Sequence, residues 1–96
     1  MYVKITDIIW LEDIVEKLWY KHNVDLHEVT EVFHNAPYFR FVEKGNRAGE
    51  NVYSALGQTA SGRYLIVFFV YKKDRQALVV SARAMEPVER RQYERR

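Results

Sequence analysis

The chain has 96 residues, of which 48% are hydrophobic, with five Phe, seven Tyr and two Trp. This composition predicts one globular domain over residues 1–96 with a modest core, and it excludes a disordered chain. The lack of cysteine excludes a disulfide framework and a thiolate metal site. No segment approaches the ~20 apolar residues that cross a bilayer, and the first ten residues lack a signal-peptide core, so we expect a cytoplasmic protein.

The charge is small in total but unevenly distributed. The formal net charge is +2. Residues 1–59 contain six Lys or Arg against nine Asp or Glu, a balance of −3, whereas residues 60–96 contain nine against four, a balance of +5. The second half would therefore attract a polyanion such as nucleic acid. The alternative is that strand ends and a terminal helix simply carry solvated arginines.

The first half predicts a strand and two helices. Residues 3–9 alternate loosely and predict an edge strand. Apolar residues then recur at helical spacing from residue 11 to about His22, and Asn23 is a plausible left-handed stop. The buried stripe of this helix is expected to contain Leu11, Ile14, Val15, Leu18 and Trp19. Because His22 lies four residues after Leu18, we expect its imidazole to continue the stripe at the edge of the core.

A capping pattern marks the second helix. Asp25 with Glu28 three residues later predicts a helix start, and Pro37 prevents a continuation beyond it. Its buried stripe is expected to contain Leu26, Val29, Val32 and Phe33.

The second half predicts a sheet and one more helix. We expect strands at residues 38–42, 52–58, 63–71 and 77–84, and a loop at residues 44–49. The third of these strands is apolar on both sides, so it should be central. In the last strand, alternation assigns Leu78, Val80, Ala82 and Ala84 to one face, and Val79, Ser81 and Arg83 to the other.

Pro87 suits the first turn of a terminal helix that runs to about residue 95. The elements together predict an α+β domain: a small, mostly antiparallel sheet of four to five strands, with two N-terminal helices packed on it and a C-terminal helix. The opposite face of such a sheet can remain open to water.

Several short motifs occur in an order that resembles the BrnT family of bacterial toxins. They are Gly49-Glu50, Tyr53, Ala55-Leu56-Gly57, Gly62-Arg63, Val80-Ser81-Ala82-Arg83-Ala84 and Glu89-Arg90-Arg91-Gln92-Tyr93. Lys21-His22 and Pro37 precede them in the order of the family. The resemblance thus covers nearly the whole chain.

The resemblance implies a specific activity. Toxins of this family are ribonucleases of type II toxin–antitoxin pairs, with a fold related to the RelE toxins, and a BrnA-like antitoxin holds them inactive. The implied reaction is attack of a ribose 2′-hydroxyl on its adjacent phosphate, which needs no metal and no other cofactor. It needs a proton acceptor, fixed positive charge and a donor for the departing 5′ oxygen.

Four residues are the candidates for this chemistry. Arg63 and Arg83 would stabilise charge on the phosphate, because a guanidinium matches phosphate oxygens with two parallel hydrogen bonds. His22 would act as acid or base, and Glu50 would accept a proton or orient an arginine. The structural alternatives are surface ion pairs for the arginines, a partly buried cap of the core for His22 and a solvated carboxylate for Glu50.

Three further residues are candidates for RNA binding. Lys21 would contact phosphate, and Tyr53 and Tyr93 would stack on a base, although a solvated lysine and packed tyrosines are the commoner explanations. The histidines show no metal-ligand spacing, so we expect no metal site.

One departure from the family leaves a second function open. Glu86 precedes Pro87 where members of the family tend to carry a hydroxyl residue that caps the last helix, so we expect weaker capping here. The chain is then alternatively a catalytically silent domain that binds RNA or a protein partner with the same sheet. A third class is a toxin-like partner that only sequesters an antitoxin.

Overall fold

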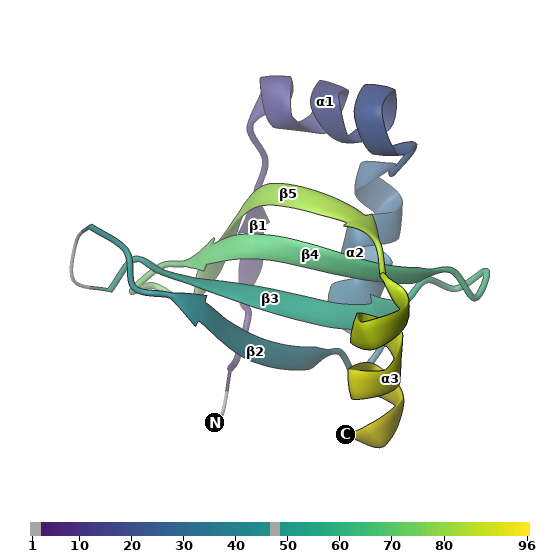
Figure 1. Cartoon of the computed structure of the whole chain (residues 1–96). Coiled ribbons are helices and arrows are strands. Elements are labelled where there is room, and N and C mark those ends of the chain that lie inside the picture. The colour runs from purple at the N-terminus through teal and green to yellow at the C-terminus, as the bar shows by residue number, and fades with distance from the viewer. Residues whose placement is uncertain (1–2, 47–48) are drawn as a thin grey trace.

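A five-stranded sheet forms the centre of the computed structural model, which describes residues 3–46 and 49–96 (Figure 1). In spatial order its strands are β1 (Asp7–Ile9), β5 (Gln76–Ala84), β4 (Tyr64–Tyr71), β3 (Asn51–Gln58) and β2 (Tyr38–Glu43). The helices are α1 (Glu12–His22), α2 (Leu26–His34) and α3 (Pro87–Arg95). Helices α1 and α2 lie on one face of the sheet, the helix face, and α3 lies on the other, the α3 face.

The sheet is mixed. The pairs β2–β3, β3–β4 and β4–β5 are antiparallel, but β1 runs parallel to β5. The predicted strand over residues 3–9 is too long, because the ladder with β5 includes only Asp7–Ile9. Before Asp7 the chain meets the β4–β5 hairpin, where the amide of Thr6 donates to the carbonyl of Arg75 over 3.0 Å. Since β5 begins at Gln76, no strand is available there to extend the pairing.

Local signals set the bounds of α1 and α2 as predicted. Asn23 adopts φ 53° and ends α1, as a left-handed stop does. The side chain of Asp25 accepts from the amide of His27, and that of Glu28 accepts from the amide of Asp25 over 3.1 Å, which forms the capping box. Val29 and Val32 of α2 are fully buried.

The described part of the chain contains no helix long and apolar enough to span a membrane.

The buried stripe of α1 is narrower than predicted. Leu18 is buried, but Leu11 precedes the helix and is exposed, and Trp19 is 60% exposed. Because α1 packs mainly over β5, next to the short edge strand β1, only a thin line of its residues meets the sheet.

Strand β4 is central, as predicted, and separates two apolar clusters. Leu65, Val67 and Phe69 point to the helix face and join the main core with Leu18, Val24 and the valines of α2. Ile66 points to the α3 face, where it packs with Leu56 and Tyr93.

A register shift corrects the predicted faces of β5. Ser81 pairs with Phe68, but the next pair is Val79 with Phe69, so Val80 is the extra residue of a β-bulge. Val79 therefore shares the helix face with Ala77 and Ala82, all fully buried, and Leu78 shares the other face with Ser81 and Arg83. The simple alternation assigned Leu78 and Val79 to the wrong faces, because a bulge depends on the partner strand.

Helix α3 covers only one end of the α3 face. It begins with Pro87, as predicted, and Tyr93 is its one buried residue. Its first turn is capped from the third helical residue, because the carboxylate of Glu89 accepts from the amide of Glu86 over 2.8 Å. The predicted loop at residues 44–49 lies partly outside the described residues.

Candidate functional site

The structure separates the predicted functional residues into two groups at opposite ends of the sheet. One end contains the C-terminus of α1, the start of β4 and the end of β5, and with them Lys21, His22, Arg63 and Arg83 (Figure 1). Glu50 and Tyr53 belong to the other end, where β3 begins. Seven residue steps along β3 correspond to roughly 23 Å. The four predicted catalytic side chains therefore do not share one site.

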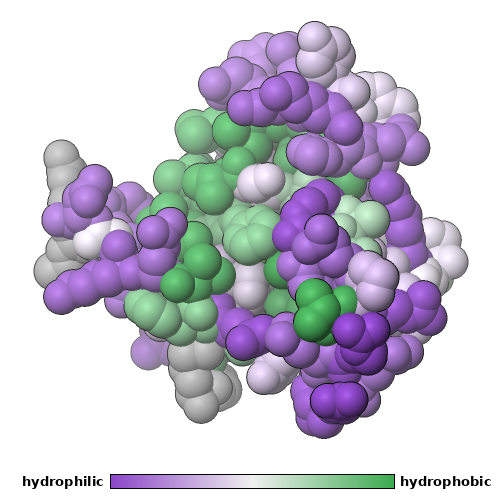
Figure 2. All heavy atoms as spheres, viewed as in Figure 1, coloured by the Kyte–Doolittle hydropathy of each residue, from purple (hydrophilic) through white to green (hydrophobic). Residues whose placement is uncertain are grey.

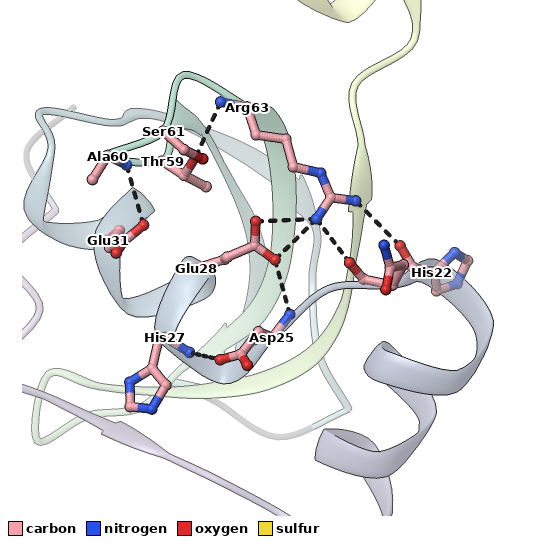
Figure 3. A network of polar contacts seen from close by, with 10 residues as sticks. His22, Asp25, His27, Glu28, Glu31, Thr59, Ala60, Ser61 and Arg63 are labelled. Carbon is pink, nitrogen blue, oxygen red and sulfur yellow. Dashed lines mark hydrogen bonds and ion pairs between the residues drawn. The ribbon is translucent and has the colours of Figure 1, made fainter.

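Arg63 is clasped between the start of β4 and the junction of α1 and α2 (Figure 3). Its Nη1 donates to the carbonyl of Asn23 over 2.7 Å and to both carboxylate oxygens of Glu28 over 2.9 and 3.1 Å. Its Nη2 donates to the carbonyl of His22 over 3.3 Å. These carbonyls belong to the end of α1, where a helix leaves acceptors without internal donors. The guanidinium therefore satisfies the end of one helix and binds the carboxylate that caps the next.

His22 is exposed, which corrects its predicted place at the edge of the core. The chain turns at Asn23, so Val24 continues the apolar stripe and is fully buried in place of His22. Lys21 is also exposed. No hydrogen bond or ion pair joins either side chain to another described residue. Both groups thus face solvent at the turn that Arg63 anchors.

Arg83 is clasped by a carboxylate of α3. Its Nη1 and Nη2 donate to the two carboxylate oxygens of Glu89, each over 2.8 Å, and the pair is partly buried. The hydrogen bonds from Arg83 lower the pKa of the Glu89 carboxyl, although desolvation acts the other way, and the same pairing raises the pKa of Arg83. The guanidinium also lies 5.6 Å from the ring centre of Phe68.

The two arginines lie on opposite faces of the sheet. Arg83 pairs with Ile66 in the ladder and contacts Phe68, so it belongs to the α3 face. Arg63 contacts Glu28 of α2 on the helix face. Each guanidinium is held by its own carboxylate, so this structure does not form the single hollow in which both would bind one phosphate.

Glu50 and Tyr53 have partners at the far end. Glu50 accepts a hydrogen bond from the ammonium of Lys72 over 2.8 Å. Tyr53 lies on the helix face, where its ring stacks with Phe69 at 6.1 Å and meets Tyr71 edge-on at 5.6 Å. Tyr53 is thus packed into the aromatic part of the core.

Tyr93 is 5% exposed, so it cannot offer its ring face to a base in this structure. The ring meets Tyr64 edge-on, and the guanidinium of Arg96 lies over it at 3.8 Å. Arg90 covers Tyr64 in the same way at 3.9 Å. At this end of the α3 face, arginine side chains therefore cover the aromatic rings.

A hollow of about 240 Å³ lies between α3 and the strands β2, β3 and β4. Leu56, Ile66 and Phe68 are among the residues of its wall, and Glu89 lies at its border. A hydrogen bond from Arg40 of β2 to Gln92 of α3 crosses from one side of the hollow to the other. The Arg83–Glu89 pair is thus next to a space that a small part of a ligand could enter.

Sequence reasoning missed Glu28 and Glu89 as partners of the two arginines. Both occupy the third position of their helices, after Asp25 and Glu86. A carboxylate at that position points back toward the residues before the helix. The third helical position was thus the sequence signal for these arginine partners. Sequence reasoning interpreted it for Glu28 only as a helix cap.

No cluster of three or more His, Asp or Glu side chains that could hold a metal ion occurs among residues 3–46 and 49–96. The α1–β4–β5 end contains cations, carboxylates and the exposed imidazole of His22.

A mixed sheet with helices on both faces, and with Lys21, His22, Arg63 and Arg83 at one end, defines the class as a small basic α+β protein. The sequence identifies the class more closely. Residues 10–89 match the family described as the ribonuclease toxin BrnT of type II toxin–antitoxin systems. The chain belongs to this family, as the resemblance predicted.

A solved structure supports the fold. The crystal structure of the ribonuclease toxin BrnT of Brucella abortus matches with a TM-score of 0.58 and 18% sequence identity, over 83% of this chain and 96% of that one. At this identity the match concerns the fold alone. A search of curated proteins gives no significant match.

Proposed function

We propose that this chain cleaves RNA by attack of a ribose 2′-hydroxyl on the adjacent phosphate, without a metal, at the α1–β4–β5 end. The observation that carries the proposal is the pair of exposed side chains Lys21 and His22, held at the end of α1 by Arg63. An acid–base group and a cation thereby occupy a fixed turn beside further arginines. This arrangement suits a reaction that needs proton transfer and charge stabilisation.

Each residue has a distinct role in the proposal. His22 either accepts the proton of the 2′-hydroxyl or donates a proton to the departing 5′ oxygen, and Lys21 binds phosphate. Arg83 stabilises the negative charge of the transition state after the phosphate replaces Glu89 as its partner. Arg63 is a positioning residue, because its donors are already used by two carbonyls and Glu28.

Glu50, Tyr53 and Tyr93 take no part in this chemistry as proposed. Glu50 lies next to the start of β3, roughly 23 Å along the strand from its other end. Tyr53 is packed into the aromatic part of the core. Tyr93 is buried and holds α3 on the sheet.

We further propose that the chain acts in the cytoplasm and is neutralised by a BrnA-like antitoxin. Membership of a type II toxin–antitoxin family supports an antitoxin partner. The relation to the RelE toxins stays a prediction.

The test is cleavage of a fluorescent RNA by the purified chain in the presence of EDTA. His22→Ala should lower the cleavage rate by about 100-fold or more, the usual contribution of a positioned acid or base. The matched control is His27→Ala, since His27 is also exposed and only its backbone amide is bound, to Asp25. Products that end in a 2′,3′-cyclic phosphate support the proposed attack. Equal rates for wild type and His22→Ala contradict the role of His22.

A second function is favoured by one observation: both arginines are occupied by carboxylates. The chain would then bind RNA or protein without cutting RNA. Wild-type protein that binds the same RNA in a filter assay and leaves it intact after hours would establish this alternative.

A further inference from the structure

The α3 face carries apolar side chains that α3 does not cover. We name them the open apolar face: Val52, Phe68, Val70 and Leu78, together with Val80, the exposed bulge residue next to Ser81 of the same face. Register places the first four on one side of three adjacent strands, because Val70 pairs with both Val52 and Leu78, and Phe68 lies two residues before Val70. Of these residues only Phe68 packs against a core cluster.

The open apolar face is accessible. Val80, at the bulge, is 37% exposed, and the other four are partly buried. Figure 2, seen from the α3 side, shows apolar atoms across the middle of the sheet, between charged surfaces at the strand ends and at α3. Three strands spaced about 4.8 Å apart present a strip about 10 Å wide, which is the diameter of one α-helix.

We propose that the open apolar face binds an apolar helix face of the antitoxin. This inference rests on the proposed function, in which the chain has such a partner. The surface is aliphatic apart from Phe68, and the guanidinium of Arg83 already lies over that ring. RNA binding to exposed surfaces relies on aromatic stacking and available cations, whereas an aliphatic surface matches a protein helix.

The charges beside the face specify the partner further. Residues 72–75 contain three Lys or Arg and one Asp, and Glu50 pairs with Lys72, so this border carries a net charge of +1. Helix α3 contains three Arg and two Glu, so the other border also carries +1. A helix with carboxylates along the edges of its apolar stripe complements these borders. A second copy of this chain would bring like charges together, so it fits the face less well.

The open apolar face adjoins the hollow, so a helix bound to the face would also affect access to the hollow. Phe68 belongs both to the open apolar face and to the wall of the hollow beside Glu89. A bound helix would cover the mouth of the hollow and hold α3 in place. RNA would then be unable to reach Arg83, which explains neutralisation by obstruction.

The experiment uses the full chain and a purified BrnA-like antitoxin, the partner that the proposed function names. Val80→Asp places a charge on the open apolar face at an exposed bulge, where the fold tolerates it. We expect the dissociation constant for the antitoxin to rise at least about 30-fold, as for a central interface residue. RNA cleavage by the variant alone should equal that of wild type, and growth arrest should persist when the antitoxin is co-expressed.

Two further variants control this experiment. Val80→Thr keeps the β-branched shape that suits a strand and should give a smaller rise. Leu11→Asp makes the same kind of change at an exposed residue before α1, where Asp is a favourable cap, and should leave the dissociation constant unchanged. Circular dichroism of each variant verifies the fold.

Several outcomes would overturn the inference. An unchanged dissociation constant for folded Val80→Asp excludes this face as the antitoxin site. Slower RNA cleavage with unchanged antitoxin binding assigns the face to RNA, and a dimer in sedimentation that Val80→Asp alone disrupts assigns it to a second copy. Failure of the proposed function is distinct, because wild-type chain alone would then neither cleave RNA nor arrest growth.

Discussion

Two arginine clasps, each a guanidinium with the groups that accept its hydrogen bonds, lie at one end of the sheet. They use the same kind of ion pair, but the helices that carry the two carboxylates are packed differently. Arg63 is held by Glu28 and by two backbone carbonyls at the end of α1, and Arg83 is held by Glu89. Helix α2, which carries Glu28, has two buried valines in the main core. Helix α3, which carries Glu89, has Tyr93 as its one buried residue.

This difference in packing makes the Arg63 clasp structural and the Arg83 clasp exchangeable, which means that a ligand can replace its carboxylate. Moving Glu28 together with α2 would expose buried valines, and drawing Arg63 toward a phosphate would leave the carbonyls of His22 and Asn23 without its donors. Both changes cost free energy. Moving Glu89 disturbs a helix with few buried apolar contacts, the kind of element that opens locally at low cost. We therefore expect phosphate to replace Glu89 at Arg83 and not to replace Glu28 at Arg63.

The largest expected effect is on catalysis, from Arg83→Ala. Loss of a cation aimed at the developing charge should lower kcat by about 100- to 1000-fold, with KM changed less. Stopped-flow cleavage of a short fluorescent RNA measures both constants. Arg83→Lys should recover only part of the rate, because an ammonium cannot form the paired hydrogen bonds. Wild-type kcat in Arg83→Ala would remove this residue from the site.

Arg63→Ala should act on stability instead. The variant leaves the carbonyls of His22 and Asn23 and the carboxylate of Glu28 without their shared donor. Urea unfolding should show a loss of about 2 kcal/mol, the scale for hydrogen bonds to charged groups. Cleavage per folded molecule should fall less than in Arg83→Ala. If stability is unchanged while kcat collapses, Arg63 is catalytic and the comparison of the clasps is reversed.

Glu89→Gln should release Arg83 from its competitor. The substitution removes the charge that holds the guanidinium, so RNA should bind more tightly and KM should fall by about 3- to 10-fold, equivalent to roughly 1 kcal/mol. Glu94→Gln is the matched control, because Glu94 lies on the same helix and pairs at the surface with Arg90. An identical KM in Glu89→Gln and wild type would show that Glu89 does not compete with RNA.

The smallest expected effect is a pH dependence of stability that arises from the same pair. The pKa of Glu89 is lowered in the folded state. Its contribution to the free energy of unfolding is therefore fully present above the pKa of the unfolded state and is lost as the pH falls through the pKa of the folded state. The free energy of unfolding of the wild type should be higher than that of Glu89→Gln by about 1 kcal/mol at neutral pH and by less in acid. Urea unfolding at a series of pH values below about 5 measures this difference. A gap that stays constant in acid would contradict the lowered pKa.

Much of the fold could be predicted from local signals. Asn23 ended α1, Asp25 and Glu28 formed the capping box, and Pro87 began α3, because each of these effects depends on neighbours in the sequence. The apolar run of β4 identified the central strand for the same reason.

Features that depend on distant partners could not be predicted. The bulge at Val80 exists only relative to β4, and the parallel direction of β1 exists only relative to β5. His22 was expected at the core edge, but the turn at Asn23 exposed it. The partners of Arg63 lie 35 residues or more away, so sequence reasoning identified the arginine without its clasp.

Nitrogen-15 NMR of the arginine side chains tests the difference between the two clasps most directly. The ligand is a short RNA whose 2′-hydroxyl is replaced by hydrogen at the cleavage position, so that it binds without reacting. We predict that the guanidinium signals of Arg83 shift with ligand concentration while those of Arg63 stay unchanged. A shift of Arg63 with Arg83 unaffected would contradict the assignment of the exchangeable clasp.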